Sequence, residues 1–252
     1  MITIKSQAEI ELMRVAGRIS KEALIAGGNM VHPGVTTAEI NAEIDRYIRS
    51  HGAVPSFKDY NGYPASACIS VNDVVIHGIP GRYVIKEGDV VSIDVGAIWK
   101  GWHGDNAATF IAGTASEEAA RLVRETRQSF YEGIKFAKAG CRIGDISHAI
   151  QQYAESRGYS VVRPFVGHGI GSKMHEEPEV PNYGKAGRGP RLAPGMTLAI
   201  EPMINMGAED VYVLDDGWTV KTADGSIAAH YENTVLITEG EPEILTLADV
   251  EI

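Results

Sequence analysis

The chain has 252 residues, of which 44% are hydrophobic and 22% are charged, and its formal net charge is -10. This composition is typical of a globular protein with a sizeable core, built as one domain or as two closely packed halves. The negative charge argues against a nucleic-acid partner and against an anionic membrane surface, because binding to either is driven by Lys and Arg.

The N-terminal segment predicts helices. Charged residues interrupt it too early for a secretory signal, and no apolar run reaches the ~20 residues of a membrane span, so we expect a cytoplasmic protein. Ser6 and Glu9 have the form of a capping box and precede apolar residues at helical spacing, which predicts a helix to about Gly27. A second capping box, from Thr36 to Glu39, opens a shorter helix.

From Cys68 onward, β-branched runs predict strands. The stretches "ACISV" and "VVIHGI" come first, and "DVVSIDVGAIWKGWHGDNAATFIA" follows as a hairpin that turns near Trp99 and Lys100. Cys68 and Cys141 could form at most one bridge and cannot build a Cys-rich zinc site. We therefore expect two reduced thiols.

An internal repeat organises the rest of the chain. Helical segments return at about 116 to 138 and 143 to 157, and "GDVVSID" recurs as "GMTLAIE" at an offset of 107. At an offset of 106 the matching pairs are Gly34 and Gly140, Ile40 and Ile146, Ile44 and Ile150, Tyr47 and Tyr153, Ser50 and Ser156, and Gly52 and Gly158. Chance similarity is the alternative, but the pattern favours a duplicated α+β half-domain with a ligand site between the halves. No linker separates the halves, and the Gly- and Pro-rich segment 184 to 195 is expected to be a loop within the second half.

Four carboxylates stand at strand positions among apolar neighbours: Asp94, Asp105, Glu201 and Glu232. A turn at Trp99 and Lys100 would place Asp94 directly opposite Asp105, and like charges in that arrangement are destabilising. The repeat makes Glu201 the equivalent of Asp94. Each acid alone is more often a hydrogen-bonded structural residue than a ligand. No Arg or Lys is embedded in these segments, however, so the four acids together favour bound metal.

The expected donor set consists of these four carboxylates and one imidazole. Two divalent cations would neutralise its four negative charges, and oxygen-rich donors with a single nitrogen suit Mn, Fe(II) or Co. Two metals held about 3.5 to 4 Å apart are the known arrangement of water-activating hydrolases, aminopeptidases included.

Two histidines, His168 and His175, stand seven residues apart in "FVGHGIGSKMHEEP". The helical pair of zinc proteases has its histidines four apart, and the glycines of this stretch argue against any helix. From the residues alone, the two histidines could bind one metal, do different jobs, or be ordinary surface or core residues. Glu176 and Glu177 first suggest metal ligands as well.

Five stretches together resemble the methionine aminopeptidases of peptidase family M24, in their short type I form. They are "GYPASACISVNDVVIHGIPG", "IDVGAIWKGWHGDNAATF", "GHGIGSKMHEEP", "AIEPMI" and "YENTVLIT", in the family's order and spacing. The resemblance implies the pseudo-two-fold pita-bread α+β fold, an antiparallel β-sheet flanked by helices. We therefore expect a single catalytic domain over 1-252, with an internal repeat of roughly 1-112 and 113-252.

The resemblance also implies the roles of the metal ligands. Asp94 would bind one metal in bidentate fashion, His168 and Glu201 the other, and Asp105 and Glu232 would bridge the two. The metals would be Co, Mn or Fe(II), with Zn or Ni as further options. A water or hydroxide between them would be the nucleophile, and the substrate's free amine would sit on the Asp94 metal.

By the same resemblance, three residues would act on the substrate. Glu201 would serve as general base and acid, His175 would hydrogen-bond the scissile carbonyl oxygen, and His77 would contact the substrate's backbone nitrogen. Glu176 and Glu177 then fall back to a solvated pair.

The family's methionine pocket maps onto Phe57, Tyr60, Tyr63, Cys68, Met174 and Trp218. A flexible thioether packs well against aromatic edges and another sulfur, so this lining suits methionine. The backbone oxygens of Asn72, Val74 and Ala228 would hold a monovalent cation.

The implied function is removal of the initiator methionine from peptides or nascent proteins when the next residue is small. We expect a monomer with a ribosome contact, and neither nucleic-acid specificity nor membrane binding. Aminopeptidase P and prolidase have the same fold, but they usually carry a further N-terminal domain for which this chain has no room. A metal-free binding or chaperone module would not need to keep all five ligand positions.

Overall fold

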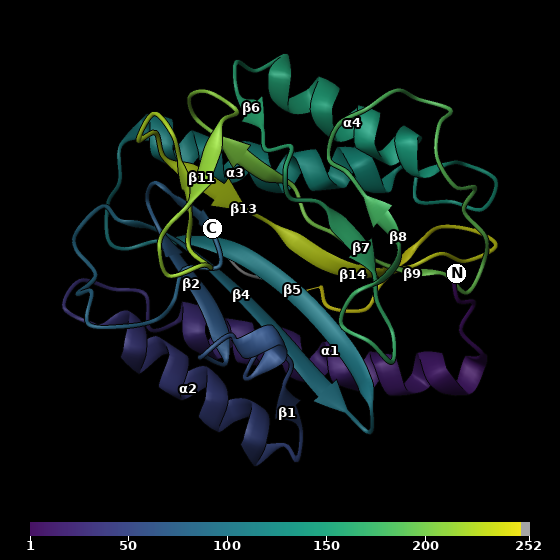
Figure 1. The fold of residues 1–252 in the computed structure, drawn as a ribbon, viewed down its shortest axis with the longest axis horizontal. Helices are drawn as coiled ribbons and strands as arrows, with labels where there is room; N and C mark the ends of the chain where they lie inside the picture. The colour runs from purple at the N-terminus through teal and green to yellow at the C-terminus, as the bar shows by residue number, and fades with distance from the viewer. Residues whose placement is uncertain (248–252) are drawn as a thin grey trace.

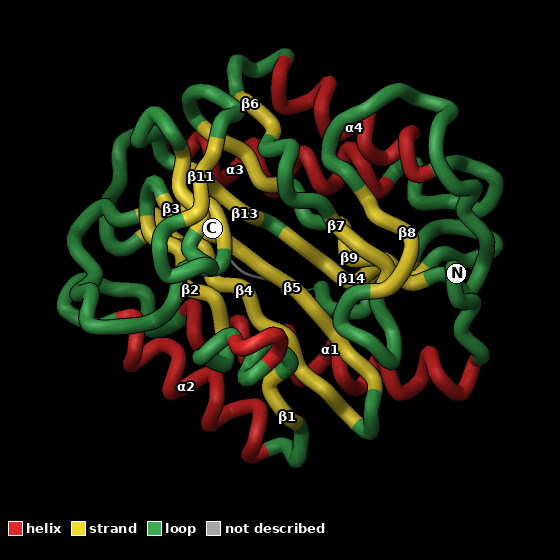
Figure 2. The backbone as a smooth tube through the Cα atoms, viewed as in Figure 1, coloured by secondary structure: helices red, strands yellow, loops and turns green. Residues whose placement is uncertain are grey.

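The computed structural model describes residues 1–247, and its helices lie on the two outer sides of a central sheet (Figures 1 and 2). The α-helices are α1 (Gln7–Gly28), α2 (Thr37–Ser50), α3 (Glu117–Ile134) and α4 (Ile143–Glu155), and η1 (Tyr60–Gly62) is a short 3₁₀ turn. In Figure 1, α1 and α2 run below the sheet, and α3 and α4 run above it. No helix among the described residues is long and apolar enough to cross a membrane.

The central sheet runs in the order β1-β4-β5-β14-β9-β7-β8, with β2 also paired to β4 and β15 to β14. Its strands are β1 (Val54–Pro55), β2 (Ala67–Val71), β4 (Val90–Trp99), β5 (Trp102–Ile111), β7 (Gly167–Gly169), β8 (Glu176–Val180), β9 (Thr197–Ile200), β14 (Glu232–Leu236) and β15 (Glu243–Ile244). Two smaller sheets, β13-β10-β6 and β11-β12-β3, are formed by β3 (Val74–Ile76), β6 (Ser160–Val161), β10 (Met203–Asn205), β11 (Val211–Val213), β12 (Val220–Thr222) and β13 (Ala228–His230). The strand pairs of these sheets are antiparallel, as expected.

Both predicted capping boxes are present. The Ser6 backbone N–H donates to the Glu9 carboxylate at 2.7 Å, and the Thr36 N–H donates to Glu39 at 2.8 Å. The apolar face of α1 packs closely on the β4–β5 hairpin, because a Cβ on Gly104 would lie 2.5 Å from the backbone nitrogen of Gly17. The caps therefore fix where the helices begin, and small residues set how closely α1 approaches the sheet.

The predicted hairpin forms, but its predicted register is wrong by two residues. Trp99 pairs with Trp102, so Asp94 faces Ala107 and Asp105 faces Gly96. The turn consists of Lys100 and Gly101 with φ of 49° and 84°, and a two-residue turn of this kind matches the twist of the flanking strands. Since a shift of two preserves the face, Asp94 and Asp105 still lie on the same side of the sheet as diagonal neighbours.

The predicted repeat is visible in the backbone. Matching glycines have matching left-handed φ values: 97° and 88° at Gly34 and Gly140, and 70° and 86° at Gly52 and Gly158. Isolated bridges also recur, Thr36 with Val84 and Arg142 with Arg191. Because L side chains rarely adopt positive φ, the repeated glycines mark the same turns in each half. Segment 184 to 195 is a loop containing one of these bridges, as predicted.

Candidate metal centre and substrate cavity

The four predicted carboxylates meet on one face of the central sheet. Asp94 and Glu232 flank Ala107 in one row across β4, β5 and β14, and Asp105 lies two residues away on β5. Glu201 follows the last residue of β9, next to the start of β14. Rows of a sheet place side chains on a common face, and the small side chain of Ala107 leaves space between the acids.

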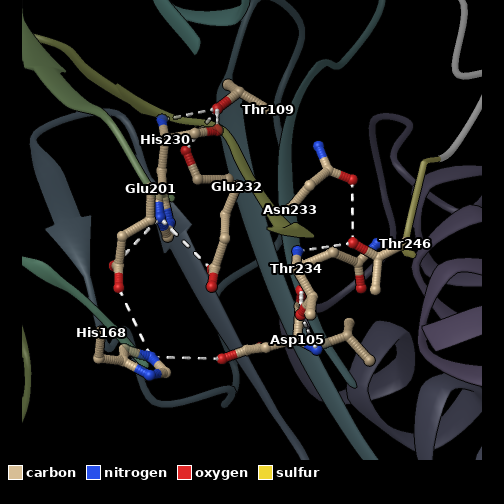
Figure 3. A network of polar contacts seen from close by, with 12 residues as sticks. Asp105, Thr109, His168, Glu201, His230, Glu232, Asn233, Thr234 and Thr246 are labelled. Carbon is tan, nitrogen blue, oxygen red and sulfur yellow. Dashed lines mark hydrogen bonds and ion pairs between the residues drawn. The ribbon is translucent and has the colours of Figure 1, made fainter. Parts of the chain in front are cut away.

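His168 joins this cluster from β7. Its Nε2 lies 3.7 Å from Glu201 Oε1 and 3.9 Å from Asp105 Oδ2 (Figure 3). Its Nδ1 lies 2.8 Å from the carbonyl oxygen of Gly169. We assign the ring proton to Nδ1, which then donates to this oxygen. The Nε2 lone pair then faces the carboxylates, as a metal-binding histidine requires. Burial lowers the pKa of His168 to about 3, so the ring is neutral near pH 7.

The glycines beside His168 permit close strand packing. A Cβ on Gly167 would lie 2.4 Å from the carbonyl oxygen of Ala199, and one on Gly169 would lie 2.2 Å from that of Glu177. Only glycine fits between β8 and β9 at these points, and this holds His168 against the cluster.

The cluster has the electrostatics of a cation site. Burial raises the pKa of Asp94, Asp105, Glu201 and Glu232 above the ordinary carboxyl range. Within residues 1–247, the buried Asp94 Oδ1, Asp105 Oδ1 and Glu232 Oε1 have no hydrogen-bond partner. Buried polar atoms normally find partners, so these unpaired oxygens fit divalent cations as the missing partner.

One further histidine, His230, lies in the cluster and was missed from the sequence. It is the last residue of β13, it is buried, and its Nε2 lies 3.6 Å from Glu201 Oε2 and 3.8 Å from Glu232 Oε2. The sequence contains a pattern that could have drawn attention to it: in both "HGDN" (103–106) and "HYEN" (230–233), a histidine stands two residues before a predicted metal ligand.

A cavity of about 210 Å³ opens onto the cluster. Its lining includes every residue that the sequence predicts as a metal ligand, a catalytic group or part of the methionine pocket, together with Asn61, Ile76, Phe165 and Val166. The last four were not predicted. The donors are therefore reachable by a ligand in the cavity despite their burial.

His77 and His175 are far apart in the sequence, but both line the cavity. The Tyr60 hydroxyl lies 2.7 Å from His175 Nδ1, and burial lowers the pKa of His175. With Tyr60 assigned as donor, the proton of the neutral ring is on Nε2, free to donate to a ligand. His77 adopts a left-handed φ of 58°, and burial lowers its pKa to about 4. Such backbone strain is uncommon for a non-glycine residue and often occurs at functional sites.

The apolar part of the cavity is built around Tyr63. Its ring meets Trp218 edge-on at 5.2 Å, and its hydroxyl donates to the carbonyl oxygen of Gly78 at 3.0 Å. Met174 is buried, and Cys68 is a buried free thiol. Cys141 is also free. The lining offers aromatic edges and two sulfur atoms to an apolar side chain.

The interpretation of Glu176 and Glu177 as a solvated pair is wrong for Glu176. Its carboxylate lies 2.7 Å from Lys5 Nζ, and these side chains are only 9% and 3% exposed. The hydroxyl of Thr3 donates to the same carboxylate at 2.6 Å. The partner is 171 residues away in sequence, so no local pattern could reveal it. Glu177 is exposed, as expected.

The residues predicted to hold a monovalent cation lie just before β3 and at the starts of β3 and β13. The carbonyl oxygen of Asn72 accepts a hydrogen bond from the Ala228 N–H at 2.9 Å, and Asn72 has a left-handed φ of 55°. Val74 follows two residues later at the start of β3.

A pseudo-symmetric fold that carries buried carboxylates and imidazoles beneath a cavity defines this protein as a metal-dependent hydrolase. A family model for metallopeptidase family M24 matches residues 11–239. The chain therefore belongs to metallopeptidase family M24.

Curated relatives match over almost their whole length. A methionine aminopeptidase of Clostridium perfringens is 58% identical over 98% of this chain and 99% of its own. Methionine aminopeptidase 1 of Bacillus subtilis is 48% identical over 98% of this chain and 99% of its own length.

Solved structures agree. The methionine aminopeptidase of Thermotoga maritima superposes with a TM-score of 0.96 at 47% identity, covering 98% of this chain and 99% of that one. A prolidase of Pyrococcus furiosus has the same fold, with a TM-score of 0.80 at 24% identity over 98% of this chain and 66% of its own. The predicted pita-bread fold is confirmed.

Proposed function

We propose that this protein is a methionine aminopeptidase that removes the N-terminal methionine from proteins. The observation that carries the proposal is the cavity, in which a carboxylate–imidazole cluster adjoins an apolar lining suited to a thioether. Relatives named methionine aminopeptidase, at 48% to 58% identity over nearly full length, support the same activity.

Asp94, Asp105, His168, Glu201 and Glu232 would hold two divalent metal ions. Their unpaired buried oxygens and the free Nε2 of His168 suit Mn, Fe(II) or Co, with Zn and Ni as further candidates. When bound, such ions lower the pKa of a coordinated water toward neutrality and supply positive charge near the scissile carbonyl.

The remaining chemistry belongs to side chains of this chain. Glu201, whose pKa burial raises, would accept the proton of the attacking water and pass it to the leaving amine. His175 would donate its Nε2–H to the scissile carbonyl oxygen, with Tyr60 holding the ring through Nδ1. His77 would contact the substrate's backbone nitrogen from the cavity wall.

The methionine side chain would occupy the part of the cavity lined by Phe57, Tyr60, Tyr63, Cys68, Met174 and Trp218. These rings and sulfur atoms enclose an unbranched thioether without a polar partner, which would disfavour charged first residues.

We further propose that the chain is a single catalytic domain with repeats of roughly 1-112 and 113-252; residues 248–252 lie outside the described part. It would act as a cytoplasmic monomer on nascent chains at the ribosome and prefer a small second residue. A monovalent cation at the backbone oxygens of Asn72, Val74 and Ala228 would brace the loop before β3.

The test is peptide hydrolysis after metal removal. Stripped protein, resupplied separately with Mn(II), Co(II) or Fe(II), should release methionine from Met-Ala-Ser and leave Xaa-Pro peptides intact. Preferential cleavage of Xaa-Pro bonds would instead indicate a prolidase-like or aminopeptidase P-like enzyme. Failure to cleave any free N-terminus with metal restored would contradict a peptidase.

A further inference from the structure

His230 is a buried imidazole whose free nitrogen points at the acids. The residue is 2% exposed, and within residues 1–247 its Nε2 has no hydrogen-bond partner. Figure 3 shows the ring between Glu201 and Glu232, with both carboxylates on the side of Nε2. None of the roles assigned above uses this nitrogen.

The surroundings of His230 match those of His168. His168 Nε2 lies 3.7 and 3.9 Å from oxygens of Glu201 and Asp105, and His230 Nε2 lies 3.6 and 3.8 Å from oxygens of Glu201 and Glu232. Glu201 stands between the rings, with Oε1 toward His168 and Oε2 toward His230. Each imidazole thus faces two carboxylates at the same spacing.

These distances are too long for hydrogen bonds, which join nitrogen and oxygen at about 2.7 to 3.2 Å. They agree with the spacing of donors around a common cation. Two donors each about 2.1 Å from a metal are separated by roughly 3.4 Å at the tetrahedral angle and by up to about 4.2 Å at wider angles. Ligand atoms of Glu201, His230 and Glu232 all lie within 4.8 Å of one another, as do those of Asp105, His168 and Glu232.

The backbone of His230 is fixed independently of its ring. Its N–H donates to Thr109 Oγ1 at 3.0 Å, and the Thr109 hydroxyl lies 2.8 Å from its carbonyl oxygen. Pairing with Met203 on β10 adds a further constraint. The ring is therefore held toward the cluster by the strand that carries it.

The repeated motif supplies an internal comparison. His103 stands two residues before Asp105 as His230 stands two before Glu232, and it too is buried. His103 Nδ1, however, lies 3.0 Å from Ser56 Oγ, a hydrogen-bond distance. Of the two equivalent histidines, only His230 faces two carboxylates with an unpaired nitrogen.

We propose that His230 is a second imidazole ligand of the metal centre, binding one ion together with Glu201 and Glu232. The centre then has two nitrogen donors instead of one, both beside Glu201. Imidazole favours Fe(II), Co, Ni and Zn over Mn, so His230 shifts the preference of its ion toward those metals. The proposal rests on the two-metal function proposed above.

The test compares His230→Gln with His103→Gln in the metal-stripped protein, using zinc alone as the probe. Histidine-selective ¹⁵N NMR reports how many ring nitrogens shift on zinc binding, and calorimetry reports the affinity of each ion. Two imidazoles should shift in the wild type and in His103→Gln, but one in His230→Gln. The affinity of one ion should fall at least about tenfold in His230→Gln only.

The outcomes separate the two proposals. If the wild type binds two zinc ions but only one imidazole shifts, His230 is not a ligand, whatever the variants do. Unchanged affinities in a folded His230→Gln would also overturn the assignment. If the wild type binds no zinc, the proposed metal function falls together with this inference.

Discussion

Glu201 is the residue on which the proposed chemistry depends most. It stands between two imidazoles in the buried cluster, so its carboxylate can both bind metal and move a proton. Glu201→Gln keeps the shape of the side chain but removes the basic oxygen, and we expect turnover to fall below detection. Steady-state hydrolysis of Met-Ala-Ser checks this. A near-normal kcat in a metal-loaded variant would remove Glu201 from the mechanism.

Tyr60 orients His175, so it should affect rate more than substrate affinity. Tyr60→Phe removes the hydroxyl that lies 2.7 Å from His175 Nδ1 but keeps the ring that lines the cavity. A hydrogen bond of this kind contributes about 1 to 2 kcal/mol, so we expect kcat to fall about 5- to 30-fold with little change in KM. A larger loss is expected for His175→Ala. An increase in KM with an unchanged kcat would mean that Tyr60 only lines the pocket.

The residues alone singled out the four acids, because each combines a charge with apolar surroundings, whereas the methionine pocket was implied by the family resemblance. An acid such as Asp94 inside "VVSIDVGA" is conspicuous without a structure. His230 was missed because its significance depends on which way the end of β13 points. Glu176 was misjudged because its partner, Lys5, is brought to it only by the complete fold.

Among the elements, the N-terminal segment and the start of β8 are joined by the Lys5–Glu176 ion pair. Although burial alone would raise the pKa of Glu176, hydrogen bonds from Lys5, Thr3 and the Lys173 backbone lower it overall. The same carboxylate accepts the Lys173 N–H at 3.2 Å, so it also ties down the loop that carries Met174 and His175.

Breaking this pair should destabilise the fold. Glu176→Gln leaves Lys5 buried without its counter-charge, and we expect a loss of about 3 kcal/mol in the free energy of unfolding, measured with denaturant. The exposed neighbour provides the matched control, since Glu177→Gln should change stability little. Equal stabilities of the two variants would mean that the pair contributes nothing.

The same pair makes a testable contribution to pH dependence. Because the pKa of Glu176 is lowered in the folded state, its contribution is complete above the ordinary carboxyl pKa of about 4 and is lost as pH falls through the folded value. The stability difference between wild type and Glu176→Gln should therefore shrink below about pH 4. A difference that stays constant in acid would contradict this.

Element boundaries were predictable where the signal is local. Capping boxes mark the starts of α1 and α2, and repeated glycines mark matching turns. The register of the β4–β5 hairpin was not predicted correctly. It depends on whether the turn is centred on Trp99 and Lys100 or on Lys100 and Gly101, and the positive φ that Gly101 permits decides this.

At the scale of the whole molecule, the repeat predicted a duplicated α+β half-domain, and the family resemblance implied the pita-bread fold, which is confirmed. Residues of both halves, such as Ile44 and Ile146, contribute to one hydrophobic cluster. Burying the cluster of acids beside this core has a stability cost, which the proposed metal ions would offset.

Metal removal should therefore destabilise the protein in a pH-dependent way. Burial raises the pKa of Asp94, Asp105, Glu201 and Glu232, so the metal-free folded state retains protons that the unfolded chain releases above about pH 4. Its stability falls as pH rises from there toward neutrality, whereas metal favours the charged carboxylates. Chelator should lower the melting temperature more at about pH 7.5 than at about pH 5.5. An unchanged melting temperature at neutral pH would contradict close clustering of the acids.

The central claim is that this cluster binds the metal that drives methionine removal. Its most direct test titrates Mn(II) or Co(II) into stripped protein while bound metal and methionine released from Met-Ala-Ser are measured in the same samples. We expect no release without metal, and a rate that rises with occupancy of the cluster. Full activity in metal-free protein, or no methionine release when the cluster is saturated, would contradict the account.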